Sequence, residues 1–329
     1  MNGSAVLVIG GAGYIGSHVC KALKEQGYIP VTFDNLSHGH EWAVKWGPLI
    51  KGDIHSSEDL DRAFDTYSPI AVIHLASHIN VRESIENPGL YYHNNLYGSL
   101  SIAEAMVRHQ VLTLVFSSSA AVYGTPLSTP IGENHPKAPL NPYGKTKSMA
   151  EDLFEDFYKA YGLSVLSLRY FNGAGADPEG ETGEAHHPET HLIPRLIETA
   201  AGRSDAMTIY GDTSATRDYI HVCDLARAHC QGMEWLEANP GSMAINLGSG
   251  EGHSIQQVIA VVEQQAGRSI PLTFTKANAF EPKTLIADVT KARELLNWAP
   301  RNSELEFIVK TAWNWHEKTA PTAPLSARN

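Results

Sequence analysis

The chain has few cysteines for its length. Three cysteines among 329 residues, Cys20, Cys223 and Cys230, are too few for a disulfide framework, and their spacing matches no metal-binding motif. Cys223 and Cys230 lie seven residues apart in a segment with a helical pattern, where we expect them to be core thiols. A reducing cytoplasm is the compartment that fits this cysteine usage.

Long apolar runs and an excess of positive charge are also missing. No apolar segment reaches the roughly 20 residues that a membrane-spanning helix needs, and Met1–Ser4 leads into a strand-like run without a basic leader. The formal net charge of −11 disfavours nucleic acid as a partner, and no block of like charge forms a tail. We therefore expect a soluble cytoplasmic protein with a small-molecule partner.

What is present, over the first two thirds, is an alternation of short β-branched runs with helical periods. The pattern predicts strands at residues 5–9, 30–33, 49–51, 71–74, 113–116 and 163–168, and helices at 15–25, 57–65, 89–108 and 143–161. This order predicts an α/β fold, a Rossmann-type doubly wound parallel sheet.

The amino-acid composition of the chain changes after this region. Residues 172–188 are rich in glycine, proline and acidic residues and are predicted to be a loop. Shorter elements follow, and they predict a smaller C-terminal α/β lobe; they lie at 192–201, 207–210, 255–265 and 289–296. We expect residues 1–170 to form the sheet domain and 171–329 mainly the second lobe, with some later segments returning to the sheet.

A glycine turn joins the first strand to the first helix. Gly10, Gly13 and Gly16 lack Cβ atoms, which lets the turn tighten, lets a pyrophosphate approach the backbone and lets the helix pack on the strand. The helix N-terminus then favours the phosphate charge. This context predicts a dinucleotide site, with a purely structural glycine turn as the alternative.

Two aspartates at strand ends sharpen this prediction. Asp34 closes the second strand, where its carboxylate can accept hydrogen bonds from both ribose hydroxyls and would repel a 2′-phosphate. NAD is therefore expected rather than NADP. Asp53 and Ile54 follow the third strand and are candidates to hold the adenine, although Asp53 can equally be an ordinary turn residue.

The candidate catalytic pair is Tyr143 and Lys147, four residues apart at the start of a helix and so on one helix face. A phenol is normally a poor base near neutral pH because its pKa is about 10. A lysine ammonium beside it, with a cationic nicotinamide nearby, would favour the phenolate and make Tyr143 a proton acceptor. With 13 tyrosines, roughly one such pair is expected by chance, so its meaning depends on its surroundings.

Those surroundings carry a resemblance over nearly the whole chain. The matching segments are GGAGYIGSH at 10–18, DNLS at 34–37, GDI at 52–54, YYHNN at 91–95, FSSSAAVYG at 116–124, NPYGKTK at 141–147, LRYFN at 168–172, RDYIHVCDLA at 217–226 and NLGSG at 246–250. The chain resembles the extended short-chain dehydrogenase/reductase superfamily, and within it the UDP-glucose (UDP-galactose) 4-epimerases.

The resemblance implies roles for individual residues. Tyr143 would be the acid/base, Lys147 would tune it and hold the nicotinamide ribose, and Ser119 would relay or position the substrate proton. NAD would contact Gly10, Gly13, Tyr14, Ile15, Gly16, Asp34, Asn35, Asp53, Ile54, Leu75, Ala76, Asn94, Ser117, Tyr143, Lys147 and Tyr170. The nucleotide sugar would contact Ser119, Ala120, Tyr143, Phe171, Asn172, His191, Leu192, Thr208, Tyr210, Arg217 and Glu281.

Some of these roles can also be argued from the residue types. Arg217 is expected at a strand-to-helix connection, where a guanidinium can clamp a diphosphate; a surface arginine capped by Asp218 is the alternative. Tyr170 and Phe171 would lie against the nicotinamide, and Asn172 beside the phosphates. The resemblance further implies a homodimer paired through the helices predicted at 89–108 and 143–161, a 1–170 domain that binds NAD and a second lobe that binds the sugar nucleotide.

The implied reaction is inversion at C4 of a nucleotide sugar through a transient 4-keto sugar. Related dehydratases carry an acidic pair where this chain has Ala120 and Ala121, and alanine cannot act as a general acid, so dehydration is disfavoured. Three alternatives remain: a 4-epimerase of another UDP-sugar (N-acetylhexosamine, pentose or uronate), a nucleotide-sugar reductase or dehydrogenase, and a dinucleotide-sensing regulator without activity.

Several positions depart from the usual epimerase pattern, all on the substrate side. Ile79 stands where some members have a cofactor-contacting lysine, for which Arg82 is a substitute in charge, and the segment before Arg217 is short. A phosphate-binding arginine is missing near Asn278, where Lys276 or Lys283 would be the replacements. Leu285 is smaller than tyrosine and favours a pocket open to N-acetylated sugars.

Three histidines in the acidic loop form a further pattern. His186, His187 and His191 are interpreted as members of a solvent-exposed loop, with His191 as a ligand contact, because zinc sites need converging ligands on a fixed scaffold. No metal is expected.

Overall fold

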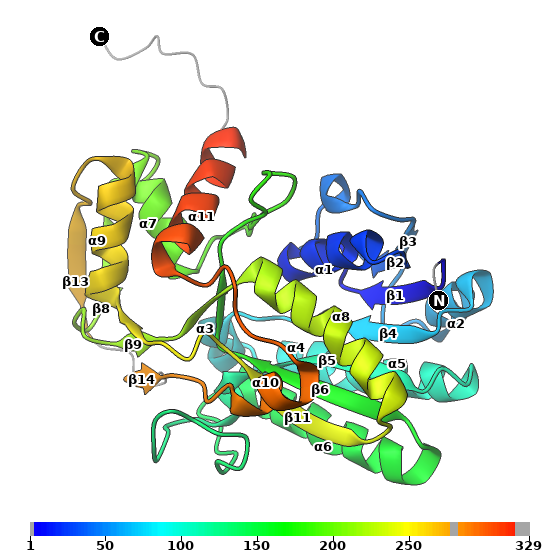
Figure 1. Cartoon of the computed structure of the whole chain (residues 1–329). Helices are drawn as coiled ribbons and strands as arrows, with labels where there is room; N and C mark the ends of the chain where they lie inside the picture. Colours follow the sequence, from blue (N-terminus) through cyan, green and yellow to red (C-terminus); the bar gives the residue numbers. More distant parts are fainter. Residues whose placement is uncertain (1–2, 277–281, 320–329) are drawn as a thin grey trace.

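The computed structural model describes residues 3–276 and 282–319. Its centre is a parallel sheet of seven strands in the order β11-β6-β5-β4-β1-β2-β3 (Figure 1). The strands are β1 (Ala5–Ile9), β2 (Ile29–Asp34), β3 (Leu49–Lys51), β4 (Ala71–His74), β5 (Thr113–Ser119), β6 (Ser164–Tyr170) and β11 (Ser242–Leu247). The predicted Rossmann-type sheet is confirmed, and β11 adds a strand that the sequence pattern did not predict.

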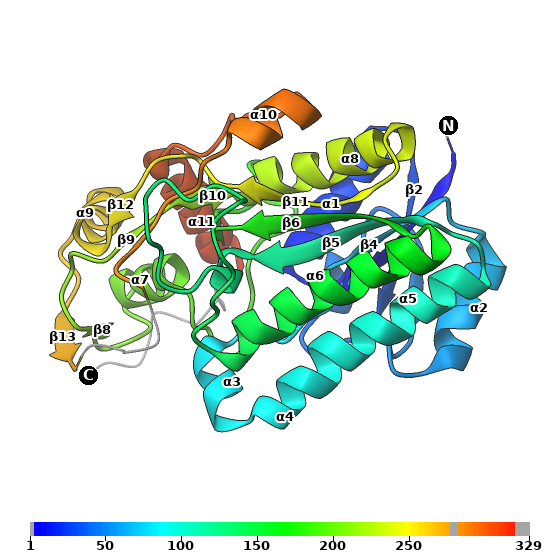
Figure 2. The same cartoon turned by 90° about the horizontal axis from the view of Figure 1, so that it is seen from below.

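Alternation along the strands builds one apolar core on each face of the sheet. On one face, Val6 and Val8 of β1 pack with the helices α1 (Tyr14–Glu25) and α8 (Val222–Ala238). On the other, Leu7 and Ile9 pack with α2 (Ser57–Tyr67), α5 (Gly98–Arg108) and α6 (Pro142–Tyr161). Figures 1 and 2 show the two helical layers with the sheet between them. A strand that is apolar at every position is what a sheet covered on both faces requires.

The prediction of one helix at 89–108 is wrong in one respect, because the helical segment is not continuous. It consists of α4 (Pro88–Tyr91), a π-helical segment at Tyr92–Tyr97 and α5. Within the π-helical segment, the buried Asn95 side chain accepts from His78 N (2.8 Å) and donates to His78 O (3.0 Å) and Thr146 Oγ1 (3.2 Å). Segments of this kind are frequent at functional sites, and this one connects α6 to the loop after β4.

The predicted smaller α/β lobe follows β6. It contains α7 (Leu192–Ala200), β8 (Met207–Tyr210), β9 (Thr216–Arg217), β12 (His253–Ser254), α9 (Ile255–Ala266), β13 (Leu272–Thr275), β14 (Thr284–Leu285) and α11 (Leu305–Thr319). Its own apolar core forms between α7, α9 and α11 (Figure 1). The prediction of a loop from residue 172 is wrong at its start, since β7 (Asn172–Ala174) pairs in parallel with β10 (Tyr219–His221).

The remaining elements are short. They are α3 (Val81–Glu86), α10 (Thr290–Leu296) and the 3-10 turns η1 (Glu41–Ala43) and η3 (Ala120–Val122). α8, β11 and α10 come from the second half of the chain but pack against the sheet domain. Among the helices of residues 3–276 and 282–319, none is long and apolar enough to cross a bilayer.

Candidate active site

Ser119, Tyr143 and Lys147 meet at the C-terminal edge of the sheet. Ser119 is the last residue of β5. The helix α6 begins at Pro142, and Asn141 caps it by accepting from Gly144 N (2.9 Å). A Cβ at Gly144 would lie 2.5 Å from Ala121 O, closer than real Cβ atoms come. Glycine at this position therefore lets α6 approach the end of β5.

Lys147 is held by the strand rather than by the tyrosine. Its Nζ donates to Ser117 O (2.7 Å) and lies 5.9 Å from the centre of the Tyr143 ring. Burial lowers the pKa of Lys147 to about 7, against the raising effect of the Glu151 charge. The Lys147 amine is thus a weaker base than usual, and it is fixed near the tyrosine ring.

Burial works against ionisation of the Tyr143 phenol. Burial raises the pKa of Tyr143, and a hydrogen bond with Ser119 lowers it only partly. The predicted phenolate depends on Lys147 together with a cationic nicotinamide, so it concerns the protein with bound cofactor and stays a prediction. A buried phenol needs more positive charge than Lys147 supplies at this distance before it becomes a base.

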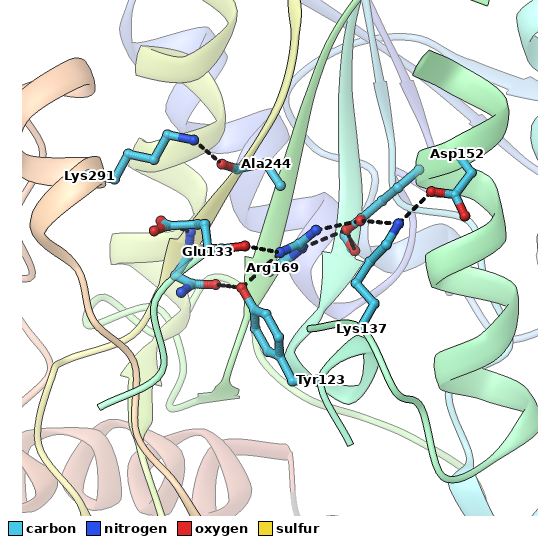
Figure 3. A network of polar contacts seen from close by, with 10 residues as sticks. Tyr123, Glu133, Lys137, Asp152, Arg169, Ala244 and Lys291 are labelled. Atoms are coloured by element: carbon cyan, nitrogen blue, oxygen red, sulfur yellow. Dashed lines mark hydrogen bonds and ion pairs between the residues drawn. The ribbon is translucent and has the colours of Figure 1, made fainter. Parts of the chain in front are cut away.

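A buried polar network supports the trio, and sequence reasoning missed it (Figure 3). The Glu151 carboxylate, one turn after Lys147, accepts from Ser118 Oγ (2.6 Å) and from Arg169 Nε and Nη2 (2.8 and 2.7 Å). Arg169 Nη1 also donates to Tyr123 OH (2.9 Å), and Tyr123 OH donates to Asn246 Oδ1 (2.6 Å). The network ties α6 to β5, β6 and β11.

The glycine turn has the shape that a pyrophosphate site needs. Gly10 has a φ of +85°, and a Cβ there would lie 2.6 Å from Ala76 N; a Cβ at Gly16 would lie 2.1 Å from Gly10 O. Gly13 begins α1 without a side-chain cap, and the first turn of α1 contains no acidic residue. The first amides of α1 are therefore available to an anion, and the residues present fit NAD.

The strand ends beside the turn bring the other predicted cofactor residues together. Asp34 accepts from Ala12 N and Leu36 N (3.0 and 2.9 Å), and burial raises its pKa while these two amides lower it. Asn35 Nδ2 lies 3.4 Å from Asp53 Oδ2. Ile54 is buried beside them, Ile15 packs against the apolar core of α1, and Leu75 and Ala76 directly follow β4.

Three predicted cofactor residues already have protein partners for their polar atoms. Tyr14 OH donates to Gly175 O (2.6 Å), Tyr170 OH lies 2.6 Å from His229 Nε2, and Asn94 Nδ2 donates to Asn95 Oδ1 (3.0 Å). Any contact that Tyr14 and Tyr170 make with a cofactor is therefore expected to use their rings.

The predicted sugar-side residues fall into two groups. Ala120 and Phe171 pack in one apolar cluster with Leu285 beside it, next to Ser119. Asn172 begins β7, and His191 and Leu192 lie at the start of α7. Ala120, Phe171 and Asn172 directly follow the carboxyl ends of β5 and β6, where ligands bind in sheets of this kind.

Arg217 lies in a strand, so its predicted place at a strand-to-helix connection is wrong: β10 separates it from α8. Its Nη1 donates to Thr216 O and Lys283 O (3.0 and 3.3 Å). The Asp218 carboxylate is buried and accepts from the amides of Ser249, Gly250 and Ala287 (2.6, 3.0 and 3.1 Å), which makes it a structural residue.

The lobes also touch at a position that the sequence singled out. The Arg82 guanidinium lies 4.5 Å above the Tyr210 ring, and its Nη1 donates to Tyr210 OH (3.0 Å). Arg82 thus contacts the second lobe.

The remaining predicted sugar-side residue with a described position is Thr208, two residues before Tyr210 on β8. Its hydroxyl oxygen lies 3.1 Å from that of Thr273 on β13. Glu281 and Asn278 lie outside the described residues.

The prediction of a solvent-exposed histidine loop holds for His187 and in part for His191, whose side chain is 42% exposed, but not for His186, at 21%. His186 Nδ1 lies 2.9 Å from Glu184 Oε1, and His191 Nδ1 makes a hydrogen bond to the same oxygen. Burial favours a neutral Glu184, but the charges and hydrogen bonds of His191 and His186 lower its pKa to about 2. The reason for the error is that Glu184, which is buried, draws the two imidazoles inward.

The uncapped N-terminus of α1 can bind an anion, and Ser119, Tyr143 and Lys147 lie beside it. Together these features define a Rossmann-type enzyme that uses a bound dinucleotide. More specifically, the chain belongs to the NAD dependent epimerase/dehydratase family, whose model matches residues 6–248. The resemblance stated from the motifs is thereby confirmed at the level of the family.

Individual relatives agree with this assignment. The UDP-glucose 4-epimerase of Rhizobium meliloti is 43% identical over 324 residues, which is 97% of this chain and 98% of the relative. A crystal structure of UDP-glucose 4-epimerase from Brucella ovis in complex with NAD is 46% identical with a TM-score of 0.92, covering 94% of this chain and 98% of that one. A UDP-glucose 4-epimerase from Stenotrophomonas maltophila, with NAD and formylated UDP-arabinopyranose, is 32% identical with a TM-score of 0.93 over 97% of this chain and 100% of that one.

Proposed function

We propose that the protein is an NAD-dependent 4-epimerase of UDP-sugars, with UDP-glucose and UDP-galactose as its substrate pair. The observation that carries the proposal is the meeting of Ser119, Tyr143 and Lys147 beside an anion-ready glycine turn. The residues after Ser119 are Ala120 and Ala121, so no carboxylic acid follows it to protonate a leaving hydroxyl.

The proposed roles follow from the geometry. Tyr143 takes the proton of the sugar C4 hydroxyl, Ser119 holds that hydroxyl beside the phenol, and Lys147 holds the cofactor ribose. NAD, when bound, supplies the reversible acceptor for the C4 hydride and the positive charge that Tyr143 needs. Tyr143 later returns its proton to the 4-keto oxygen after the sugar has presented its opposite face. One tyrosine thus serves both directions, and no second redox substrate is consumed.

The sugar-nucleotide half is assigned by position and charge. Asn172 and Arg217 are proposed to bind the phosphates, and Ala120, Phe171 and Leu285 to line the sugar pocket. A leucine at 285 leaves more room than a tyrosine, so UDP-N-acetylglucosamine and other UDP-sugars remain second candidates. If only UDP-glucose and UDP-galactose interconvert at appreciable rates, the wider-pocket hypothesis is wrong.

One incubation tests the proposal. The purified protein is mixed with UDP-, GDP- and dTDP-sugars without added NAD, and the products are resolved by chromatography. A 4-epimerase converts UDP-galactose to UDP-glucose catalytically from its retained cofactor. A reductase or dehydrogenase instead needs stoichiometric NAD(H), and a dinucleotide-sensing regulator gives no product; either result contradicts the proposal.

We also propose that residues 1–170 bind NAD, that 171–329 mainly bind the sugar nucleotide, and that the protein works in the cytoplasm as a homodimer. Exposed apolar side chains support pairing through this side of the molecule: Tyr97, the residue before α5, is 48% exposed, and Met149 and Tyr161 of α6 are 44% and 56% exposed. Exposed apolar patches of this kind commonly mark protein interfaces.

A further inference from the structure

Four metal-ligating side chains converge in the loop before α7. One donor atom from each of Glu184, His186, Glu189 and His191 lies within 4.8 Å of the other three. Glu184 Oε1 is the centre, 2.9 Å from His186 Nδ1 and hydrogen-bonded to His191 Nδ1, while Glu189 Oε2 lies 3.9 Å from His186 Nδ1. Two imidazoles and two carboxylates thus face one small volume.

The scaffold of this cluster is fixed from three sides. Trp315 Nε1 of α11 donates to Glu184 O (2.8 Å), and His40 Nε2 lies 2.7 Å from Ala185 O. Thr182 shares a hydrogen bond with Ser17 of α1 (2.7 Å between their hydroxyl oxygens). The convergence that zinc sites require on a rigid support is therefore present, although the loop composition did not indicate it.

The Nδ1 atom of His186 is available to a ligand. This atom is buried and, among the described residues, makes no hydrogen bond of acceptable direction, even though the Glu184 oxygen is 2.9 Å away. Zinc bonds of about 2.0–2.1 Å place neighbouring ligand atoms roughly 3.3 Å apart. His186 Nδ1 lies 2.9 Å from Glu184 Oε1 and 3.9 Å from Glu189 Oε2, and His191 is hydrogen-bonded to Glu184, so an ion would enter after small side-chain shifts. A dication with two neutral imidazoles and two carboxylates leaves no net charge.

We propose that Glu184, His186, Glu189 and His191 bind one divalent transition-metal ion of the zinc type. Imidazole and carboxylate ligands suit zinc and its first-row neighbours. The His186 ring contacts the edge of Tyr14 in the glycine turn (6.2 Å between ring centres), and His191 directly precedes α7. The ion would join the start of α1 to the start of α7 and take no part in the C4 chemistry.

A neighbouring group of three carboxylates differs from this cluster because a lysine already neutralises it. Asp177, Glu179 and Glu181 also lie close enough to share an ion, but Lys21 Nζ is 2.8, 3.1 and 2.7 Å from their carboxylates. An ammonium therefore already satisfies that group. In the cluster of Glu184, the ion pairs found within the described part of the chain involve the imidazoles themselves.

Binding of Zn²⁺ and Co²⁺ tests the proposal without any sugar nucleotide, so its failure is separate from failure of the epimerase assignment. Full-length protein without a histidine tag is stripped with a chelator and titrated by calorimetry with Zn²⁺ and by visible absorption with Co²⁺. One equivalent of metal, with the intense bands of tetrahedral Co²⁺, is expected, together with a higher midpoint of thermal unfolding.

The variants His186→Gln and Glu189→Gln should each weaken Zn²⁺ binding by roughly 100-fold or more. The matched control is His187→Gln, since His187 is exposed in the same loop and should bind metal like the parent protein. Circular dichroism confirms that each variant is folded. Absence of stoichiometric binding in the parent, or equal affinity in His186→Gln, would overturn the proposal and leave an ion-pair cluster with protonated histidines.

Discussion

At the scale of single residues, Tyr143 must act as a base although burial raises the pKa of its phenol. The change Tyr143→Phe removes only the hydroxyl, so turnover should fall by about 100-fold or more, the usual contribution of a positioned acid/base. Chromatographic assay of UDP-galactose conversion measures the effect, and the NAD released on denaturation reports cofactor content. Loss of NAD together with activity would mean that the phenol acts in binding, and unchanged turnover would remove Tyr143 from the mechanism.

Lys147 gives a second residue-scale prediction, on stability. Its pKa is about 7 in the fold against an ordinary value of 10.5, so between these values the unfolded chain holds a proton that the folded chain lacks. Raising the pH through this window therefore stabilises the fold. The free energy of unfolding of the cofactor-free protein, minus that of Lys147→Met, should rise between pH 7 and 8.5 by about 1 kcal/mol per pH unit. Parallel pH profiles for the two proteins would contradict the burial of a weakly basic lysine.

At the scale of elements, the Arg169–Glu151 pair locks β6 to α6. Both side chains are only 7% exposed, so Glu151→Gln leaves a buried guanidinium without its counter-charge. Such a change should cost about 3 kcal/mol of unfolding free energy, measured by urea denaturation. The matched control is Glu155→Gln on the same helix, because the Glu155–Lys159 pair is exposed and its loss should have little effect. Equal effects of the two changes would mean that the network does not hold α6 in place.

The sequence predicted single helices, strands and local motifs, but not the contacts between separate elements. The strands from β1 to β6 follow from local apolar runs, and the glycine turn, Asp34 and the Tyr143–Lys147 spacing follow from local motifs. The Arg169–Glu151 pair and the convergence on Glu184 could not be predicted, because their partners come from separate elements. The anchors of Glu184 and Ala185 are Trp315 and His40, which lie more than 100 residues away in the chain. From its composition this segment is predicted to be an exposed loop, because composition does not reveal the long-range contacts that hold it.

At the scale of the whole molecule, the proposed pairing through α5 and α6 rests on exposed apolar side chains of α6 and on Tyr97, the residue before α5. A charge placed there should oppose association, so Met149→Asp is expected to shift the proteins toward monomers in light scattering coupled to size-exclusion chromatography. Leu127→Asp is the control, since Leu127 is 82% exposed but lies in the loop after β5. A monomeric parent protein, or an unchanged mass for Met149→Asp, would contradict pairing through these helices.

The glycine between the catalytic pair limits what the site can become. Any side chain at position 144 would meet Ala121 O at 2.5 Å and push the start of α6 outward, carrying the phenol away from Ser119. The absence of a Cβ atom at position 144 thus sets the distance between the Tyr143 phenol and Ser119. Exchange of loops and sugar contacts can alter which nucleotide sugar enters, but the distance over which the proton moves stays the same as long as position 144 has no side chain.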